Sequence, residues 1–133
     1  MTYSNGLVRA YKLFKKRKDG TYGPAQVEQK NLVCSRYVPG VMYEAEDANP
    51  RYLKHRPGFH CCAIPYAPHM KDDMPGRAWC EVLIRVKGTE QRPESQGGLW
   101  FLASELLIVR EVDGEELERL RSAAPDHAIT PVQ

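Results

Sequence analysis

The sequence lacks the features that place a chain in a membrane, in a secretory pathway or in a familiar enzyme class. No apolar run approaches the ~20 residues that a membrane-spanning helix needs. In the N-terminal segment the positive charges follow the short apolar patch, which is the reverse of a secretory signal. No Gly-rich phosphate loop, H-E-x-x-H helix or G-x-S-x-G elbow occurs. We therefore expect a cytoplasmic protein without a membrane partner.

The chain has only four cysteines and four histidines, and six of these eight side chains gather in one region. They are His55, His60, Cys61, Cys62, His69 and Cys80. Zinc takes these donor types, but usually with one pair at C-x2-C or H-x3-H spacing, and that pairing is absent. The adjacent Cys61 and Cys62 are poor disulfide partners for each other. We predict no metal site, and we expect reduced thiols that pack as small apolar side chains.

The chain does contain enough apolar residues for one globular domain. Its 133 residues match the commonest domain size, and 42% of them are hydrophobic. Neither an internal repeat nor a domain linker is visible. We predict a single domain over residues 1–125, followed by a loose C-terminal tail over 126–133.

Strand patterns dominate this domain. The clearest covers residues 77–87, where one predicted face consists of Ala78, Cys80, Val82, Ile84 and Val86. We expect Val82 and Ile84 to be buried. Further strands are predicted over residues 7–14, 41–46, 59–64 and 99–112, the third as an inner strand and the last as one strand or two. Proline, glycine and polar residues predict loops over residues 47–58, 65–76 and 88–98, with at most one helical turn in the second.

One helix is well signalled after the last strand. Asp113 is suited to cap it, Glu116 completes a capping box, Leu117 and Leu120 supply an apolar stripe, and Pro125 ends it. The predicted fold class is therefore α+β. The sheet is expected to be mostly antiparallel, and either curved or a split half-barrel, with one C-terminal helix.

Charge is unevenly distributed along the chain. The net charge is only +2, yet positive charge predominates in residues 1–60 and negative charge in residues 61–133. The basic run Lys15, Lys16, Arg17 and Lys18 makes nucleic acid a candidate partner. The alternative is a solvated basic hairpin, which is the more common role of such a run.

Two segments are hard to explain by core packing alone, residues 56–60 (RPGFH) and 92–101 (RPESQGGLWF). Each combines arginine, proline and glycine with an aromatic residue near the start of a strand. We predict that the sheet brings both to one cleft, where arginine binds an anion and Trp100 stacks on a ring of the ligand. The residues expected to bind the ligand are Arg56, Phe59, His60, Arg92, Gln96 and Trp100. In the alternative, the segments lie at opposite ends of the sheet and Trp100 is a core residue.

Four stretches carry a resemblance to known proteins. They are VRAYKLF at residues 8–14, VPGVMYEAE at 38–46, GFHCC-x-x-P at 58–65 and RAWCEVLI at 77–84. Their order resembles a loose group of small phage and bacterial proteins of unassigned function. That group is marked by a Gly-Phe-His-x-Cys signature, which is matched here by residues 58–60 and Cys62.

The order of strands is also similar to that of small ADP-ribosyltransferases, such as the rifampin-modifying kind. This similarity implies an enzyme that uses NAD, in which Tyr11 on the first strand contacts the NAD. The strand start at Phe59 and His60 and the loop 92–98 would occupy comparable places. No His-Gly-Thr element is present in the first strand, and no clear Glu-x-Glu or Gln-x-Glu pair precedes a strand. Glu94 is the only candidate acid in the loop, so Glu94 and His60 are the candidate catalytic residues.

Two functions follow from these patterns. The first is a small binding or accessory module, phage-borne or bacterial, that engages a nucleotide or other anionic ligand, nucleic acid or a protein, and for which no cofactor is predicted. The second is an ADP-ribosyltransferase-like enzyme that uses NAD. Because the catalytic pattern of those enzymes is absent, the binding module is the preferred prediction.

Overall fold

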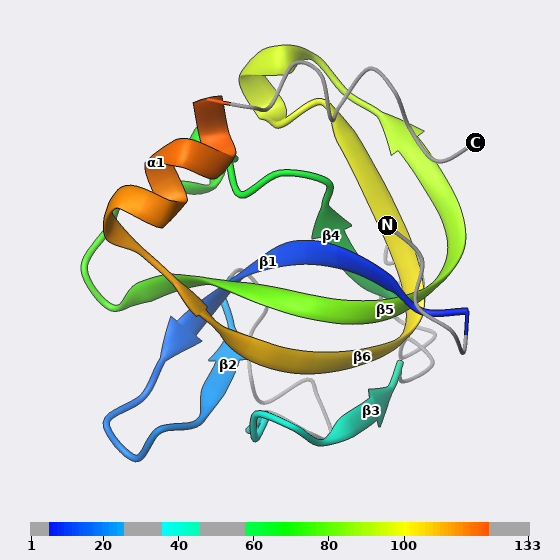
Figure 1. Ribbon diagram of the computed structural model, residues 1–133, viewed down its shortest axis with the longest axis vertical. Helices are drawn as coiled ribbons and strands as arrows, with labels where there is room; N and C mark the ends of the chain where they lie inside the picture. The colour runs from blue at the N-terminus through cyan, green and yellow to red at the C-terminus, as the bar shows by residue number, and fades with distance from the viewer. Residues whose placement is uncertain (1–5, 26–35, 46–57, 123–133) are drawn as a thin grey trace, which may run out of the picture.

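The computed structural model describes residues 6–25, 36–45 and 58–122 (Figure 1). Along the chain the elements are β1 (Val8–Lys16), β2 (Tyr22–Pro24), β3 (Met42–Glu44), β4 (Phe59–Cys62), the 3₁₀ helix η3 (Pro68–Met70), β5 (Arg77–Gln91), the 3₁₀ helix η4 (Glu94–Gln96), β6 (Leu99–Val112) and α1 (Gly114–Ser122). All the strand pairs are antiparallel. The predicted α+β class, with a mostly antiparallel sheet and a C-terminal helix, is confirmed. Pro125 and the predicted tail 126–133 lie outside the described residues.

β5 and β6 form a long hairpin that carries most of the core. Their register runs from Trp79 opposite Val112 to Gln91 opposite Leu99. Residues 99–112 thus form one strand rather than two. The prediction that 88–98 is all loop was wrong for residues 88–91, which belong to β5. Their backbone pairs with the start of β6, and a segment held by a neighbouring strand needs no apolar alternation of its own.

Four strands pair with one another in a circuit. β1 pairs with β5 over eight registered residues, β5 pairs with β6, and β6 pairs with β4. β4 returns to β1 at a single registered pair, Tyr11 opposite Cys62. β4 therefore lies between β1 and β6, which confirms the predicted inner strand, although it ends at Cys62. β2 and β3 extend the sheet from β1 and β6.

One face of the sheet carries the larger apolar core. Val82 and Ile84 have no exposed surface, which confirms the prediction for β5. Phe14 is also fully buried, and its ring lies 5.8 Å from that of Tyr22 and 6.0 Å from that of Tyr37. Burial of this apolar surface is the main stabilising contribution to the fold.

The opposite face carries a second, smaller core beneath α1. Its buried members are Tyr11, Leu13, Cys62, Ala67, Trp79, Trp100 and Val112. Leu117 and Leu120 of α1 pack against this cluster, as the predicted apolar stripe requires. The Glu116 carboxylate accepts two bonds from the Arg110 guanidinium, at 2.6 and 2.5 Å, so it serves an ion pair with β6 rather than the expected capping box.

Arg121 fixes the end of α1 to the segment between β4 and β5. Its Nε donates to the carbonyl of Pro65 at 2.7 Å, and its guanidinium lies 3.2 Å from the Asp72 carboxylate. Asp72 in turn accepts a bond from the Ala67 amide at 2.9 Å. This segment contains a single 3₁₀ turn, as predicted. Within the described ranges, no helix is long and apolar enough to cross a membrane.

Candidate functional site

The pairing of β4 with β6 brings together the two segments that the sequence singles out. His60 lies opposite Leu102, and Cys62 lies opposite Trp100. Beside them is a pocket with a volume of about 90 Å³. Its walls come from β4, the end of β5 and the start of β6: His60, Gly88, Thr89, Glu90, Trp100, Phe101 and Leu102. Figure 1 shows two of the strands that form its walls, β4 and β6, where β6 descends from the loop at the top.

Trp100 is held in place from several sides. Only 3% of its surface is exposed, and its Nε1 donates to the carbonyl of Gln96 at 2.7 Å. The Arg92 guanidinium stacks 4.2 Å from the centroid of the indole ring, and the His69 ring meets it edge-on at 5.9 Å. The expectation that Trp100 offers an open stacking surface was therefore wrong. Trp100 is a core residue that also contributes to the pocket wall.

Arg92 is engaged within the protein as well. Besides stacking on Trp100, its guanidinium lies 3.1 Å from the Glu90 carboxylate. Its backbone amide donates to the carbonyl of Gly98, which closes the loop between β5 and β6. The positive charge that was expected to meet an anionic ligand is thus largely balanced by Glu90.

The other residues expected in the site are distributed unevenly. Gln96 contributes its carbonyl to the Trp100 bond, and Glu94 is exposed on η4 and does not line the pocket. Phe59 belongs to the larger core, where its ring centroid lies 6.1 Å from that of Tyr37. Tyr11 is buried one strand away, on the far side of Cys62. Arg56 lies outside the described residues.

Glu90 and Thr89 line the pocket and were missed because their segment was expected to be a loop. The sequence GTEQ at residues 88–91 has no apolar alternation to signal a strand, and only the structure shows that residues 87, 89 and 91 are exposed while residues 88 and 90 are half-buried. This alternation continues the period of the preceding strand.

The three cysteines in the described ranges, Cys61, Cys62 and Cys80, have the character of core side chains. Burial raises the pKa of the Cys61 thiol to about 11 and that of Cys80 to about 12, and it also raises the pKa of Cys62. A thiol that stays protonated is a poor nucleophile and a poor metal ligand. Among the described residues, no group of three or more His, Cys, Asp or Glu side chains is placed to hold a metal ion.

The absence of a metal remains a prediction for the whole chain, because His55 and Cys34 lie outside the described residues. We expect purified protein to contain well under one zinc ion per chain, since the described thiols are buried and protonated. Elemental analysis of protein purified without chelator is the measurement. About one zinc per chain, removed by chelation together with loss of the folded state, would contradict this expectation.

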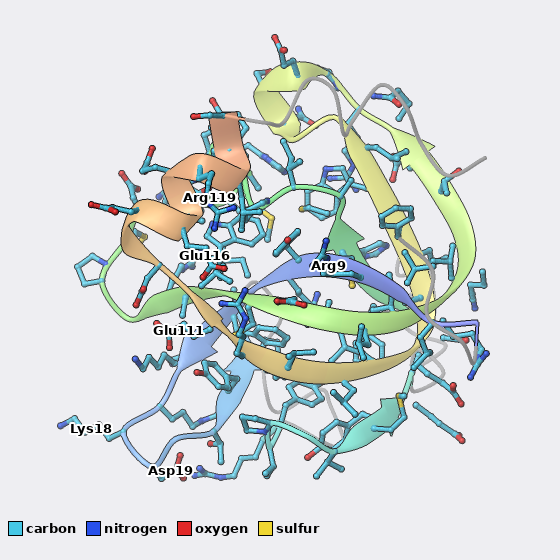
Figure 2. All side chains as sticks on the ribbon, viewed as in Figure 1. Arg9, Lys18, Asp19, Glu111, Glu116 and Arg119 are labelled. Atoms are coloured by element: carbon cyan, nitrogen blue, oxygen red, sulfur yellow. The ribbon has the colours of Figure 1, made fainter. Side chains whose placement is uncertain are left out.

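The basic run on β1 and the turn after it is partly neutralised by neighbouring acids. Lys16 lies 3.0 Å from Glu111, and Asp19 in the same turn lies 2.6 Å from Arg36. Figure 2 shows Lys18 and Asp19 together at the end of the β1–β2 turn, with Glu111 close by on β6. The loop between β5 and β6 lies at the opposite end of the molecule (Figure 1), so the basic turn and the pocket are separate surfaces.

Comparison of the chain with protein-family models, curated proteins and solved structures found no match. The function is therefore inferred from the site alone.

Proposed function

We propose that this protein is a non-catalytic binding module that receives one small group of its partner in the pocket between β4, β5 and β6. The observation that carries the proposal is the convergence of two segments distant in sequence on a lined pocket. Loops and strand ends held by a rigid sheet are common positions for binding residues.

The size and chemistry of the pocket limit what can enter it. Its volume of about 90 Å³ is well below the roughly 300 Å³ at which pockets for whole small ligands begin. The edge of a single ring or the end of one side chain fits. Leu102 and Trp100 supply apolar wall, while His60, Thr89 and Glu90 offer groups that can hydrogen-bond the edge of a ring. A nucleobase is therefore the first ring to test.

An ADP-ribosyltransferase-like enzyme is less well supported by the same geometry. A whole NAD molecule exceeds the pocket, and Glu94, the acid that the resemblance would need, is not among its lining residues. Arg92 is paired with Glu90 rather than directed at a phosphate.

The sheet itself is proposed to be curved or a split half-barrel, as the strand pattern predicts. Support comes from three register shifts between β5 and β6, next to residues 81–82, 85–86 and 86–88. Shifts of this kind bend a strand and increase its twist. The circuit of pairs from β1 through β5, β6 and β4 fits the same shape.

Gly88 allows the pocket to be filled without strain. It has no positive φ, and a Cβ added there would meet its nearest neighbour, the Leu102 Cβ, at 3.9 Å. In Gly88→Leu the new side chain occupies the pocket. We expect the affinity for the best hit from a thermal-shift screen of nucleosides, nucleotides and NAD to fall about tenfold or more, because the ligand and the leucine compete for one space.

Gln91→Leu is the matched control, because it adds the same side chain to an exposed position of the same strand. It should leave the affinity unchanged. Equal affinity for Gly88→Leu and Gln91→Leu, with both variants folded, would show that the ligand binds elsewhere. Release of nicotinamide from NAD that is abolished by Glu94→Gln would instead establish the enzyme.

A further inference from the structure

A row of polar side chains crosses the face of the sheet beside α1, away from the pocket. Tyr11 on β1 lies opposite Glu81 on β5, and Glu81 lies opposite Arg110 on β6. Tyr11 and Glu81 are each 7% exposed, which is unusual on a face whose other buried residues are apolar. Figure 2 shows Arg9 on β1, and Glu116 and Arg119 on α1, around this region.

Both carboxylates of this region pair with Arg110. Arg110 lies 3.0 Å from Glu81 and makes its two bonds with Glu116. Arg119 approaches Glu116 only at 3.9 Å, with 71% of its own side chain exposed. Glu81 and Glu116 carry two negative charges against the three positive charges of Arg9, Arg110 and Arg119, so one positive charge of this region is not balanced by the cluster.

Among the charged and hydroxyl-bearing side chains of this region that the structure describes, those of Arg9 and Tyr11 have no partner within the protein. They are two residues apart on β1, so their side chains leave the same face of the strand. In the part of the chain that the structure describes, the Arg9 guanidinium makes no ion pair or hydrogen bond, and neither does the Tyr11 hydroxyl. Burial raises the pKa of Tyr11, while the nearby Arg9 opposes that shift. The phenol is therefore protonated at neutral pH and acts as a hydrogen-bond donor toward its surroundings.

We infer that Arg9 and the Tyr11 hydroxyl form a binding site for an oxyanion, the phosphate or carboxylate group of a ligand. A guanidinium offers two parallel donors to such a group, and a neutral phenol adds a third. Glu81, opposite Tyr11 on β5, is buried and pairs with Arg110, whose side chain is 46% exposed. This site is independent of the pocket, because none of its residues lines that pocket.

The experiment is a titration with inorganic phosphate, and separately with acetate, followed by the chemical shifts of the Arg9 side chain and of the β1 amides. We expect saturable shifts with one of the two anions, which identifies the oxyanion preferred. Tyr11→Phe removes only the hydroxyl, and Arg9→Gln removes the charge. Each should weaken binding about tenfold, as expected for one hydrogen bond to a charged group.

Lys18→Gln is the control for net charge, because it removes the same charge from the exposed β1–β2 turn. It should change the affinity less than twofold. An equal loss in Lys18→Gln and Arg9→Gln would reduce the effect to general electrostatics and overturn the site. The same conclusion follows if neither anion gives a saturable shift, or if folded Tyr11→Phe binds as the unaltered protein does.

Discussion

Replacing Phe14 with alanine is expected to lower the free energy of unfolding by about 3–5 kcal/mol. The ring is fully buried, and it is shared between Tyr22 and Tyr37 at centroid distances of 5.8 and 6.0 Å. β1 is paired on the side of β5 over eight registered residues, so the strand cannot move to close the cavity without breaking that ladder. The packing contacts of the Phe14 ring are therefore lost, and an unfilled cavity remains in the core.

Urea unfolding monitored by circular dichroism measures this change. Val109→Ala is the control, because Val109 lies on β6 of the same sheet and 40% of its surface is exposed. Its effect should be about 0.5 kcal/mol or less. If Phe14→Ala lowers the free energy of unfolding by less than about 1 kcal/mol, the packing of Phe14 with Tyr22 and Tyr37 is not central to the core.

The second large effect is expected at Gly97, in the loop that positions Trp100. Gly97 has a φ of +97°, and a Cβ added there would lie 2.5 Å from the carbonyl oxygen of Tyr66. Gly97→Ala combines an unfavourable backbone conformation with a clash against backbone, and it should cost about 2–4 kcal/mol. Because the loop holds the Gln96 carbonyl on the indole, the fluorescence of Trp100 should change as well.

Gly76→Ala separates the two contributions. Gly76 has a similar φ of +86°, but a Cβ there would meet nothing within 4 Å. Only the conformational cost of about 1–2 kcal/mol is expected, with no change near Trp100. Equal costs for the two variants would indicate that the loop yields easily and does not hold Trp100 rigidly.

The strands could be predicted from the sequence because their alternation is local. Val82 and Ile84 repeat at the period of two, and that period is sufficient to assign the buried face of β5. The segment 88–91 was assigned wrongly because its strand character comes from pairing with β6, which no local pattern reports.

The candidate site was only partly predictable, for a related reason. The proximity of His60 to the start of β6 follows from an expected sheet, but the partners of each side chain depend on which strands become neighbours. Arg92 was expected to meet a ligand, and it stacks instead on Trp100 and pairs with Glu90 two residues earlier. Likewise, the sequence gives no indication that Arg110 reaches both Glu81 and Glu116.

The position of β1 in the sheet has a consequence for the order of folding. Val8 pairs with Ile84 and Lys15 pairs with Arg77, so the first strand cannot complete its ladder until β5 has been synthesised. Contacts between such distant parts of a chain are slow to form, because the entropy of closing the intervening loop must be overcome first. During that interval the apolar side chains of β1, Leu13 and Phe14 among them, remain unprotected on the nascent chain. The basic residues that follow, Lys15 to Lys18, lie where charge discourages such a strand from associating with other chains.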